Sequence, residues 1–535
     1  MTLRETPVDE AAATPAPRPR VRLWAAATGI VALLAFLGSA EVAALFFGAA
    51  SSPLTAVGSA VIDLAPPGAK QVMVALFGVG DKAALFVLMG ILLVIITGLA
   101  GLLEHRRSAW GRSIFLLGGV LAVAAVVTRS DASELQSIPA LVGTVVAVLV
   151  LGRLAQRLQR WERATSGGGP AVPALRSPGL ERRDFLRLAG VAAAAAVVLG
   201  AGARVIQAAQ VNAAALRARI RLPRAAVAEE AVPSGASLDV AGITPYVTPT
   251  SDFYRIDTAL SIPQIDPSSW TLEITGMVEK KVSLTFDQLL AKPLVEHMAT
   301  LSCVSNEVGG DLVGNALWLG YPIRDLLAEA KPRAGADMVL SRSIDGFTAS
   351  TPLSVLQDAG TDALLAVGMN GQPLPLQHGF PARLVVPGLY GYVSATKWVV
   401  SLEVTTFAAT TAYWTTRGYS AKAPVKLQSR VDTPTQGASL RAGTIAVAGV
   451  AWEPHVGVAK VEVRIDEGDW VEATLADSVS DDTWRQWVYR WDATAGSHGI
   501  EVRATNKDGV TQSSTPVAPA PNGAEGWDGV TVSVS

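Results

Sequence analysis

The chain contains a single cysteine in 535 residues, Cys303, within the segment Leu301–Asn306. A lone thiol cannot form an intramolecular disulfide, and it cannot supply the several thiolates of a structural zinc site or an iron–sulfur cluster. Three roles remain open for Cys303: a small buried apolar side chain, a nucleophile, or one soft ligand to a metal that is held mainly by another group.

Two other segments carry features of a ligand site. The chain after Cys303 is rich in glycine, which lets the backbone approach a large polar ligand. The segment Asn370–Gly388 contains His378 and Arg383, five residues apart, and Lys397 follows it. Together with the cysteine segment, these motifs resemble the sulfite oxidase family of molybdopterin enzymes, and the resemblance runs from about residue 253 to the C-terminus.

The resemblance implies a molybdenum–molybdopterin cofactor. In that family a cysteine thiolate ligates molybdenum and the dithiolene of the pterin supplies two further sulfurs, so Cys303 is the expected metal ligand. A histidine and an arginine hold the pterin phosphate, and a short loop with a lysine contacts the same cofactor. The expected cofactor-binding residues are therefore Arg255, Cys303, Asn306, His378, Arg383, Ser394, Ala395, Thr396 and Lys397.

The substrate side departs from the family. Glu307 stands where sulfite oxidases place arginines that bind sulfite, and a carboxylate there would repel a dianion. The alternative is that Glu307 faces solvent or caps the Gly309-Gly310 turn. The active-site tyrosine of the family is replaced locally by Thr416, and Arg417 and Tyr419 are the nearest substitutes. The expected catalytic residues are Cys303, Arg255, Arg417 and Tyr419.

The elements that position these residues are short. An alternating pattern predicts a strand over Trp270–Ile274, and Thr285–Leu290 is typical of a short helix with a threonine cap. From about residue 428, short β-branched and aromatic segments separated by turns resemble the immunoglobulin-like dimerisation domain of the same family, which allows a homodimer. The expected strands include Val447–Trp452, Val461–Ile465, Trp487–Trp491 and Ile500–Ala504.

The first 210 residues carry long apolar runs. Two of them are long enough to cross a hydrocarbon core of about 30 Å, and arginines gather on alternate loops. This pattern predicts a multi-pass membrane protein with its N-terminus in the cytoplasm; the alternative is a set of buried helices in a soluble protein. The first four runs are Trp24–Gly48, Ala83–Leu103, Ser113–Val127 and Ile138–Leu151.

A fifth apolar run, Leu188–Val205, follows the segment Glu181–Arg187. That segment resembles a twin-arginine export signal, whose receptor is the twin-arginine translocase. The alternative is that Arg182 and Arg183 are only the cytoplasmic flank of a membrane helix. We expect an uncleaved fifth helix, with everything beyond about residue 210 outside the cytoplasm.

These patterns predict a multi-domain chain: an all-α transmembrane anchor, an α+β molybdopterin domain of the sulfite oxidase type, and an all-β immunoglobulin-like sandwich. The expected segments are a cytoplasmic tail (1–22), the membrane anchor (23–210), a linker (211–245), the molybdopterin domain (246–427) and the dimerisation domain (428–535).

The expected function is two-electron oxygen-atom transfer on a small sulfur compound, either a sulfur oxyanion such as sulfite or a sulfoxide. Oxidation is favoured; the alternatives are a sulfoxide reductase resembling methionine-sulfoxide reductases and a non-catalytic membrane receptor that retains the fold. None of the five histidines lies inside an apolar run, so no haem ligand pair is expected and electrons must pass to a separate partner, linked to cytochrome c or quinone. The net charge of −2 gives no indication of nucleic-acid binding.

Overall fold

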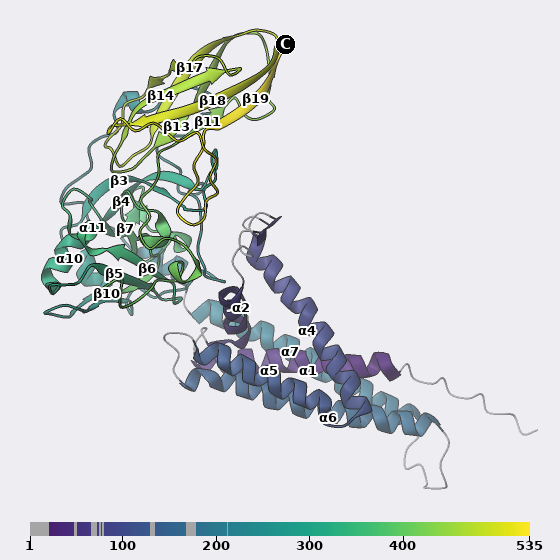
Figure 1. The fold of residues 1–535 in the computed structure, drawn as a ribbon. Helices are drawn as coiled ribbons and strands as arrows, with labels where there is room; N and C mark the ends of the chain where they lie inside the picture. Colours follow the sequence, from purple (N-terminus) through teal and green to yellow (C-terminus); the bar gives the residue numbers. More distant parts are fainter. Residues whose placement is uncertain are drawn as a thin grey trace, which may run out of the picture. The chain divides into compact units, whose positions relative to one another are not determined.

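The structure is a computed structural model that describes residues 21–535 except 48–50, 66–71, 74, 75, 78, 79, 129–133, 167–177 and 211. Residues 1–20 of the expected cytoplasmic tail lie outside the described residues. The chain forms two compact units, Met1–Gln210 and Val211–Ser535. Figure 1 shows a helical first unit and a second unit built mainly from β-sheets.

The first unit is a bundle of long apolar helices around α1. Five helical segments among the described residues are long and apolar enough to cross a membrane. Their bounds differ from the apolar runs mainly at polar ends that stay helical. The helices are α1 (Val21–Phe47), α2 (Pro53–Leu64), α4 (Asp81–Arg106), α5 (Trp110–Val127), α6 (Ile138–Ser166, preceded by the 3₁₀ turn η3, Glu134–Ser137) and α7 (Pro178–Gln210).

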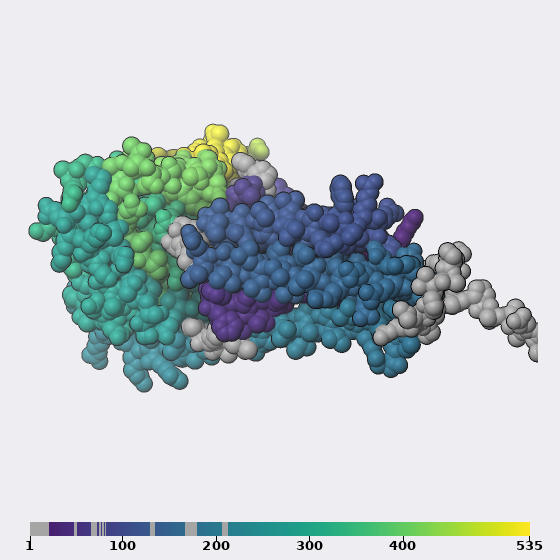
Figure 2. All heavy atoms as spheres, turned by 90° about the horizontal axis from the view of Figure 1, so that it is seen from below, coloured from purple at the N-terminus to yellow at the C-terminus, as the bar shows by residue number. Residues whose placement is uncertain are grey.

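Small residues let α1 lie close to its neighbours. A Cβ added to Gly29 would meet the carbonyl oxygen of Thr97 on α4, and one added to Gly38 would meet that of Ala196 on α7. Close approach at small residues is a common way for apolar helices to pack. Figure 2 shows the blue helices α5 and α6 packed side by side.

The twin-arginine-like motif lies near the start of α7. Phe185 of this motif is buried between Trp24 of α1 and Trp161 of α6, with ring centroids 5.8 Å away in both cases. Asp184 pairs with Arg157 of α6 at 3.4 Å. The motif therefore helps to pack the helical unit, whether or not it is also an export address.

The second unit begins with a central domain of two sheets (Figure 1). One sheet has the order β2-β1-β10-β5-β6, with β1 parallel to β10 and the other pairs antiparallel. Its strands are β1 (Thr271–Gly276), β2 (Val282–Thr285), β5 (Met338–Ser343), β6 (Thr348–Pro352) and β10 (Val399–Thr405). The other sheet has the order β3-β4-β7-β8, with β9 on β7, and comprises β3 (Val295–Ser302), β4 (Val313–Pro322), β7 (Leu364–Met369), β8 (Gln372–Pro373) and β9 (Arg383–Val385).

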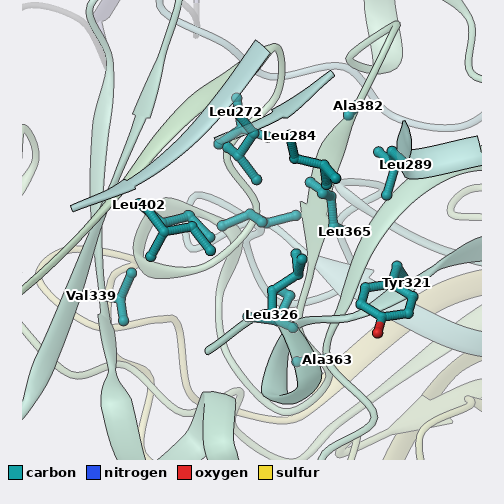
Figure 3. Close-up of a cluster of buried hydrophobic side chains, with 14 of the residues drawn as sticks. Leu272, Leu284, Leu289, Tyr321, Leu326, Val339, Ala363, Leu365, Ala382 and Leu402 are labelled. Atoms are coloured by element: carbon teal, nitrogen blue, oxygen red, sulfur yellow. The ribbon is translucent and has the colours of Figure 1, made fainter. Parts of the chain in front are cut away.

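The core of the central domain lies between these sheets. In Figure 3, Leu272 and Leu402 of the first sheet and Leu365 of the second converge with side chains from the short helices. These helices are α9 (Phe286–Leu290), α10 (Ile323–Ala330) and α11 (Leu353–Gln357). The predicted threonine cap is confirmed, because Thr285 accepts from the backbone of Gln288 in a capping box.

The C-terminal domain is a sandwich of two sheets with Val447, Trp487 and Ile500 in its core. The four expected strands lie within β13, β14, β17 and β18. One sheet contains β11 (Gln428–Thr433), β13 (Gly443–Trp452), β17 (Arg485–Ala493) and β16 (Thr474–Leu475). The other contains β12 (Ser439–Leu440), β19 (Asp528–Val534), β18 (Gly496–Asn506), β14 (Val458–Ile465) and β15 (Val471–Glu472).

The segment predicted as a linker is packed against both domains of the second unit. It includes α8 (Ala213–Arg219), whose Arg217 donates to the carbonyl oxygens of Pro373 and Leu374. Farther on, the backbone N–H of Leu238 donates to the side chain of Gln486 in the sandwich. These bonds attach the segment to both the central domain and the sandwich, and we call this segment the connecting strap.

Candidate active site

A cavity opens beside Cys303 in the central domain. Its empty space is about 880 Å³, counting the part open to solvent. Five stretches of chain that are far apart in sequence provide its walls. The lining residues are Phe253, Tyr254, Ile256, Asp257, Thr258, Cys303, Val304, Ser305, Ser343, Asp345, Phe347, His378, Arg383, Gly391, Tyr392, Ala395, Lys397, Trp398, Trp414 and Tyr419.

Cys303 stands at the end of β3, where the strand turns away from the sheet. Its backbone N–H donates to the carbonyl oxygen of Leu312, and the backbone N–H of Ser305 donates to its Sγ at 3.4 Å. Burial raises the pKa of the Cys303 thiol, although the bonds from Ser305 oppose that shift. The thiol is therefore neutral at neutral pH unless a cation binds the sulfur.

Asn306 shapes this loop and does not line the cavity. Its side-chain oxygen accepts from the backbone N–H of Leu312 at 2.7 Å, so it closes the turn that carries Cys303. In the described structure the contribution of Asn306 to the site is to position Cys303.

The inner end of the cavity is built from His378, Arg383 and Lys397, which are all buried. His378 ends the 3₁₀ turn η5 (Leu376–His378), and Arg383 begins β9 five residues later. The guanidinium of Arg383 donates from Nη1 to the carbonyl oxygen of His378 at 3.3 Å and lies over the ring of Trp318. Gly379 between them has φ +112°, and a Cβ there would meet Arg383 at 2.9 Å.

The electrostatics of this end are those of an anion site. Burial, with the charges of Arg383 and Lys397, lowers the pKa of His378 to about 3, so the imidazole is neutral. Within the part of the chain that the structure describes, the buried Nε2 of His378 has no hydrogen-bond partner. Burial also lowers the pKa of Arg383 to about 10 and that of Lys397 to about 8. Two buried cations beside an unpartnered polar atom favour a bound anion.

Arg255 contacts the carboxylate of Asp257, a residue that lines the cavity. Its Nε donates to Asp257 at 2.9 Å, and Lys397 donates to the same carboxylate at 2.7 Å. Asp257 and its neighbour Ile256 line the cavity, whereas Arg255 does not. Ile256 and Asp257, which follow Arg255 in the sequence, therefore face the cavity, and Arg255 positions Asp257.

The side chains of the predicted loop Ser394–Lys397 point in two directions. Ala395 and Lys397 line the cavity. The hydroxyl of Ser394 donates to the carbonyl oxygen of Tyr390, and that of Thr396 bonds Ser341 at 2.7 Å, so both side chains face the protein interior.

The outer end of the cavity is aromatic. Tyr419 lines it and packs against Tyr392 and Trp414, with ring centroids 5.5 and 5.0 Å away. Arg417 does not line the cavity: its guanidinium lies 3.6 Å from the centre of the Tyr413 ring, near the 3₁₀ turn η7 (Thr415–Arg417). Of the two residues expected to substitute for the family tyrosine, Tyr419 therefore lines the cavity and Arg417 does not.

Two findings differ from what the sequence predicts around the substrate. Glu307 is exposed and does not line the cavity, which favours the solvent-facing alternative over a charge filter in the substrate path. Phe347, Asp345 and Trp414 line the cavity but carry no motif that distinguishes them from ordinary core or turn residues. They come from the β5–β6 hairpin and the segment before η7.

Comparison with known proteins gives family matches for both domains of the second unit. Residues 259–414 match the family described as oxidoreductase molybdopterin binding domain, and residues 428–502 match a bacterial Ig domain. Mitochondrial sulfite oxidase of Mus musculus is 30% identical over 272 residues, which are 43% of this chain and 49% of that protein. The central domain belongs to the sulfite oxidase family of molybdenum-cofactor oxidoreductases.

Other matches to the molybdopterin domain have similar extent. Human mitochondrial sulfite oxidase is 28% identical over 322 residues, 51% of this chain and 58% of that protein, so the chain spans about half the length of the curated relatives it matches. The crystal structure of the sulfane dehydrogenase SoxCD from Paracoccus pantotrophus aligns with a TM-score of 0.47 at 21% identity, over 58% of this chain and 90% of that one.

The residues of the molybdopterin domain fit the cofactor of the family. One thiol is present where one is needed, because the pterin supplies the other sulfurs. The buried cations Arg383 and Lys397 and the unpartnered Nε2 of His378 provide the charge and the donor that a phosphate requires. Cys303 would hold the metal, and the inner end would hold the pterin phosphate.

Proposed function

We propose that the chain is a membrane-anchored, extracytoplasmic molybdopterin oxidoreductase that oxidises a small sulfur compound by oxygen-atom transfer. The observation that carries the proposal is Cys303 in a cavity whose inner end holds Arg383, Lys397 and the unpartnered Nε2 of His378. For sulfite the balance is sulfite plus water to sulfate, two protons and two electrons. When bound, the molybdenum cofactor supplies the exchangeable oxygen and takes up the electron pair.

In this proposal, each side chain at the inner end has one task. Cys303 binds as a thiolate, and burial keeps it protonated until a cation is present. Arg383 and Lys397 bind the phosphate as cations, and Asp257 holds the ammonium of Lys397 in place. These interactions fix the position of the cofactor relative to the substrate, which is the main contribution of the protein to such chemistry.

The electron pair then leaves for a separate acceptor, linked to cytochrome c or quinone. In the first unit, His105 is the one described histidine, and it lies in the last turn of α4, where it pairs with Glu162 at 3.1 Å. The described helices therefore offer no pair of axial haem ligands. This supports an acceptor that is not part of the chain.

The test is metal analysis and turnover of the full-length protein purified from a host that makes the cofactor. Near-stoichiometric molybdenum and oxidation of at least one sulfur compound with an artificial electron acceptor are expected. The assay panel is sulfite, thioethers, sulfoxides and chlorate. Cys303→Ser should lower turnover at least about 100-fold. Full activity in that variant, or purified protein without molybdenum, would refute the proposal.

The extracytoplasmic location has its own test. We propose that Arg182 and Arg183 are read by the twin-arginine translocase before α7 packs, because Phe185 of the same motif is buried in the helical unit. Changing Arg182 and Arg183 to lysine should protect residues beyond 210 from external protease in spheroplasts. Phe185→Leu keeps the pair and serves as a control for packing damage. Digestion of the double-lysine variant to the same extent as the unaltered chain would show another export route.

A further inference from the structure

The outer end of the cavity has an apolar collar, which we define as Ile256, Phe347, Trp414 and Tyr419. Ile256 is 41% exposed although it is a large aliphatic residue, and Phe347 and Trp414 are half-buried. These side chains come from three separate segments of the domain. Large apolar side chains that stay partly in water around an opening are typical of a ligand-binding rim.

The collar is held in a fixed arrangement. The backbone N–H of Tyr413 donates to the hydroxyl of Thr348 at 3.0 Å, which joins the segment of Trp414 to the β5–β6 hairpin of Phe347. The rings of Phe347 and Tyr413 lie 5.8 Å apart, and Trp414 packs on Tyr419. The two aromatic walls are therefore positioned before any ligand enters.

The charges of the lining favour an uncharged substrate. Among the lining residues the cations are Arg383 and Lys397, and both belong to the inner end. Lys397 is already paired with Asp257, and His378 is neutral. The described outer lining contains a carboxylate, Asp345, and aromatic rings, but no arginine or lysine. A small dianion would gain little there, whereas an organic group would bury apolar surface.

We propose that the collar binds the organic group of an uncharged organosulfur substrate, a thioether or its sulfoxide, and directs its sulfur toward Cys303. This rests on the proposed function and names its substrate class. The reaction balances as thioether plus water to sulfoxide, two protons and two electrons, with the electrons passing one at a time to two equivalents of a one-electron acceptor. The reverse reaction consumes the same two protons and two electrons from a reductant.

The test uses the molybdenum-loaded full-length protein and three donors: methyl phenyl sulfide, dimethyl sulfide and sulfite. Ferricyanide accepts the electrons, and reduced viologen with the matching sulfoxides tests the reverse direction. Wild-type protein should prefer methyl phenyl sulfide or its sulfoxide over sulfite in kcat/KM. Trp414→Ala and Phe347→Ala should each lower kcat/KM for the phenyl compound about 10-fold, mainly through KM, and for the dimethyl compound less than about 3-fold.

Two controls separate this result from damage to the fold. Trp470→Ala truncates a tryptophan of the sandwich that lies outside the cavity, and it should leave all rates unchanged. Trp414→Leu keeps an apolar side chain and should recover part of the loss, and rates are expressed per bound molybdenum. Sulfite turned over faster than either organosulfur pair, with no change in the phenyl-to-methyl ratio in Trp414→Ala, would overturn the collar while the proposed function stands. Molybdenum-loaded protein that turns over none of these compounds would overturn both.

Discussion

Two buried histidines of the second unit have opposite surroundings. His297, on β3, lies between carboxylates: its Nε2 is 2.8 Å from Asp482 of the sandwich and its Nδ1 is 3.4 Å from Glu229 of the connecting strap. These partners outweigh burial and raise the pKa of His297 to about 9. His378, at the inner end of the cavity, lies among cations, and burial with those charges lowers its pKa to about 3.

The difference separates a structural contact from a ligand site. At His297 the imidazolium and its carboxylates balance one another, and both ring nitrogens have partners. At His378 the positive charges of Arg383 and Lys397 exceed the negative charge of Asp257, and Nε2 has no partner among the described residues. Unbalanced charge and an unpaired polar atom are unfavourable in a buried site unless a ligand binds there. The comparison also predicts that the two histidines respond differently to mutation and pH.

The largest effect is expected from His297→Gln, which removes the cation between Glu229 and Asp482. Breaking a buried charge pair typically costs about 3–5 kcal/mol in the free energy of unfolding. Thermal unfolding of the full chain in detergent measures it. His455→Gln is the control, because His455 is half-exposed and lies 3.8 Å from the same Asp482, and it should cost less than about 1 kcal/mol.

The same contact gives a signed pH dependence. Because the folded-state pKa of His297 is raised above 6.5, its stabilising contribution is fully present below about pH 6.5 and is lost as the pH rises through about 9. A shift of this size corresponds to on the order of 3 kcal/mol. The His297→Gln variant should therefore lack this alkaline loss. An unfolding profile of the variant that falls as steeply as that of the wild type above pH 7 would contradict the assignment.

At the cavity, Arg383→Ala should act on cofactor occupancy more than on folding. Removing a charge-assisted pair to a phosphate costs about 2 kcal/mol, or roughly a 30-fold weaker binding of the cofactor. Molybdenum per mole of folded protein is the measurement. Arg417→Ala removes a guanidinium outside the cavity lining and should keep full occupancy. Full occupancy in Arg383→Ala with a raised KM would move Arg383 to the substrate side.

His378→Leu should have a smaller effect of the same kind. It keeps apolar packing against Phe253, whose ring lies 5.6 Å away, but removes the unpartnered nitrogen. Loss of one hydrogen bond of a neutral group costs about 1 kcal/mol, so occupancy should fall about 5-fold at limiting cofactor. Unfolding of the cofactor-free variant should change little, since removal of the unpartnered Nε2 offsets the loss of the hydrogen bond to the backbone of Thr250. A large loss of stability instead would make His378 a second structural histidine.

The inner end of the cavity could be predicted from sequence because its residues are local. His378 and Arg383 are five residues apart, and Cys303 is unique in the chain, so short motifs define them. Motifs do not give side-chain direction, however: Asn306, Ser394 and Thr396 lie in the right loops but bond to the protein interior. Spacing alone cannot show on which side of a loop a hydroxyl or amide falls.

Apart from Tyr419, the outer end could not be predicted, because the fold alone assembles it. Phe347 and Trp414 are separated by many residues and line one cavity only when the β5–β6 hairpin packs on the segment before η7. Aromatic residues in strands and turns usually belong to a core, so nothing marks them in advance. The apolar helices were easier to predict from the sequence, because the length of an apolar run can be read from consecutive residues.

The smallest effect is expected from Glu307→Gln, at the residue that sequence comparison placed in the substrate path. Glu307 is exposed and outside the cavity lining, and charges in water are screened within about 10 Å at 0.1 M salt. The KM for sulfite, or for any anion that the enzyme accepts, should stay within about 2-fold of wild type. Asp345→Asn is the matched change inside the lining, and it should lower that KM in a salt-dependent manner. A marked fall in Glu307→Gln with none in Asp345→Asn would show that the anion enters past Glu307, and that the collar of Ile256, Phe347, Trp414 and Tyr419 is not the entrance.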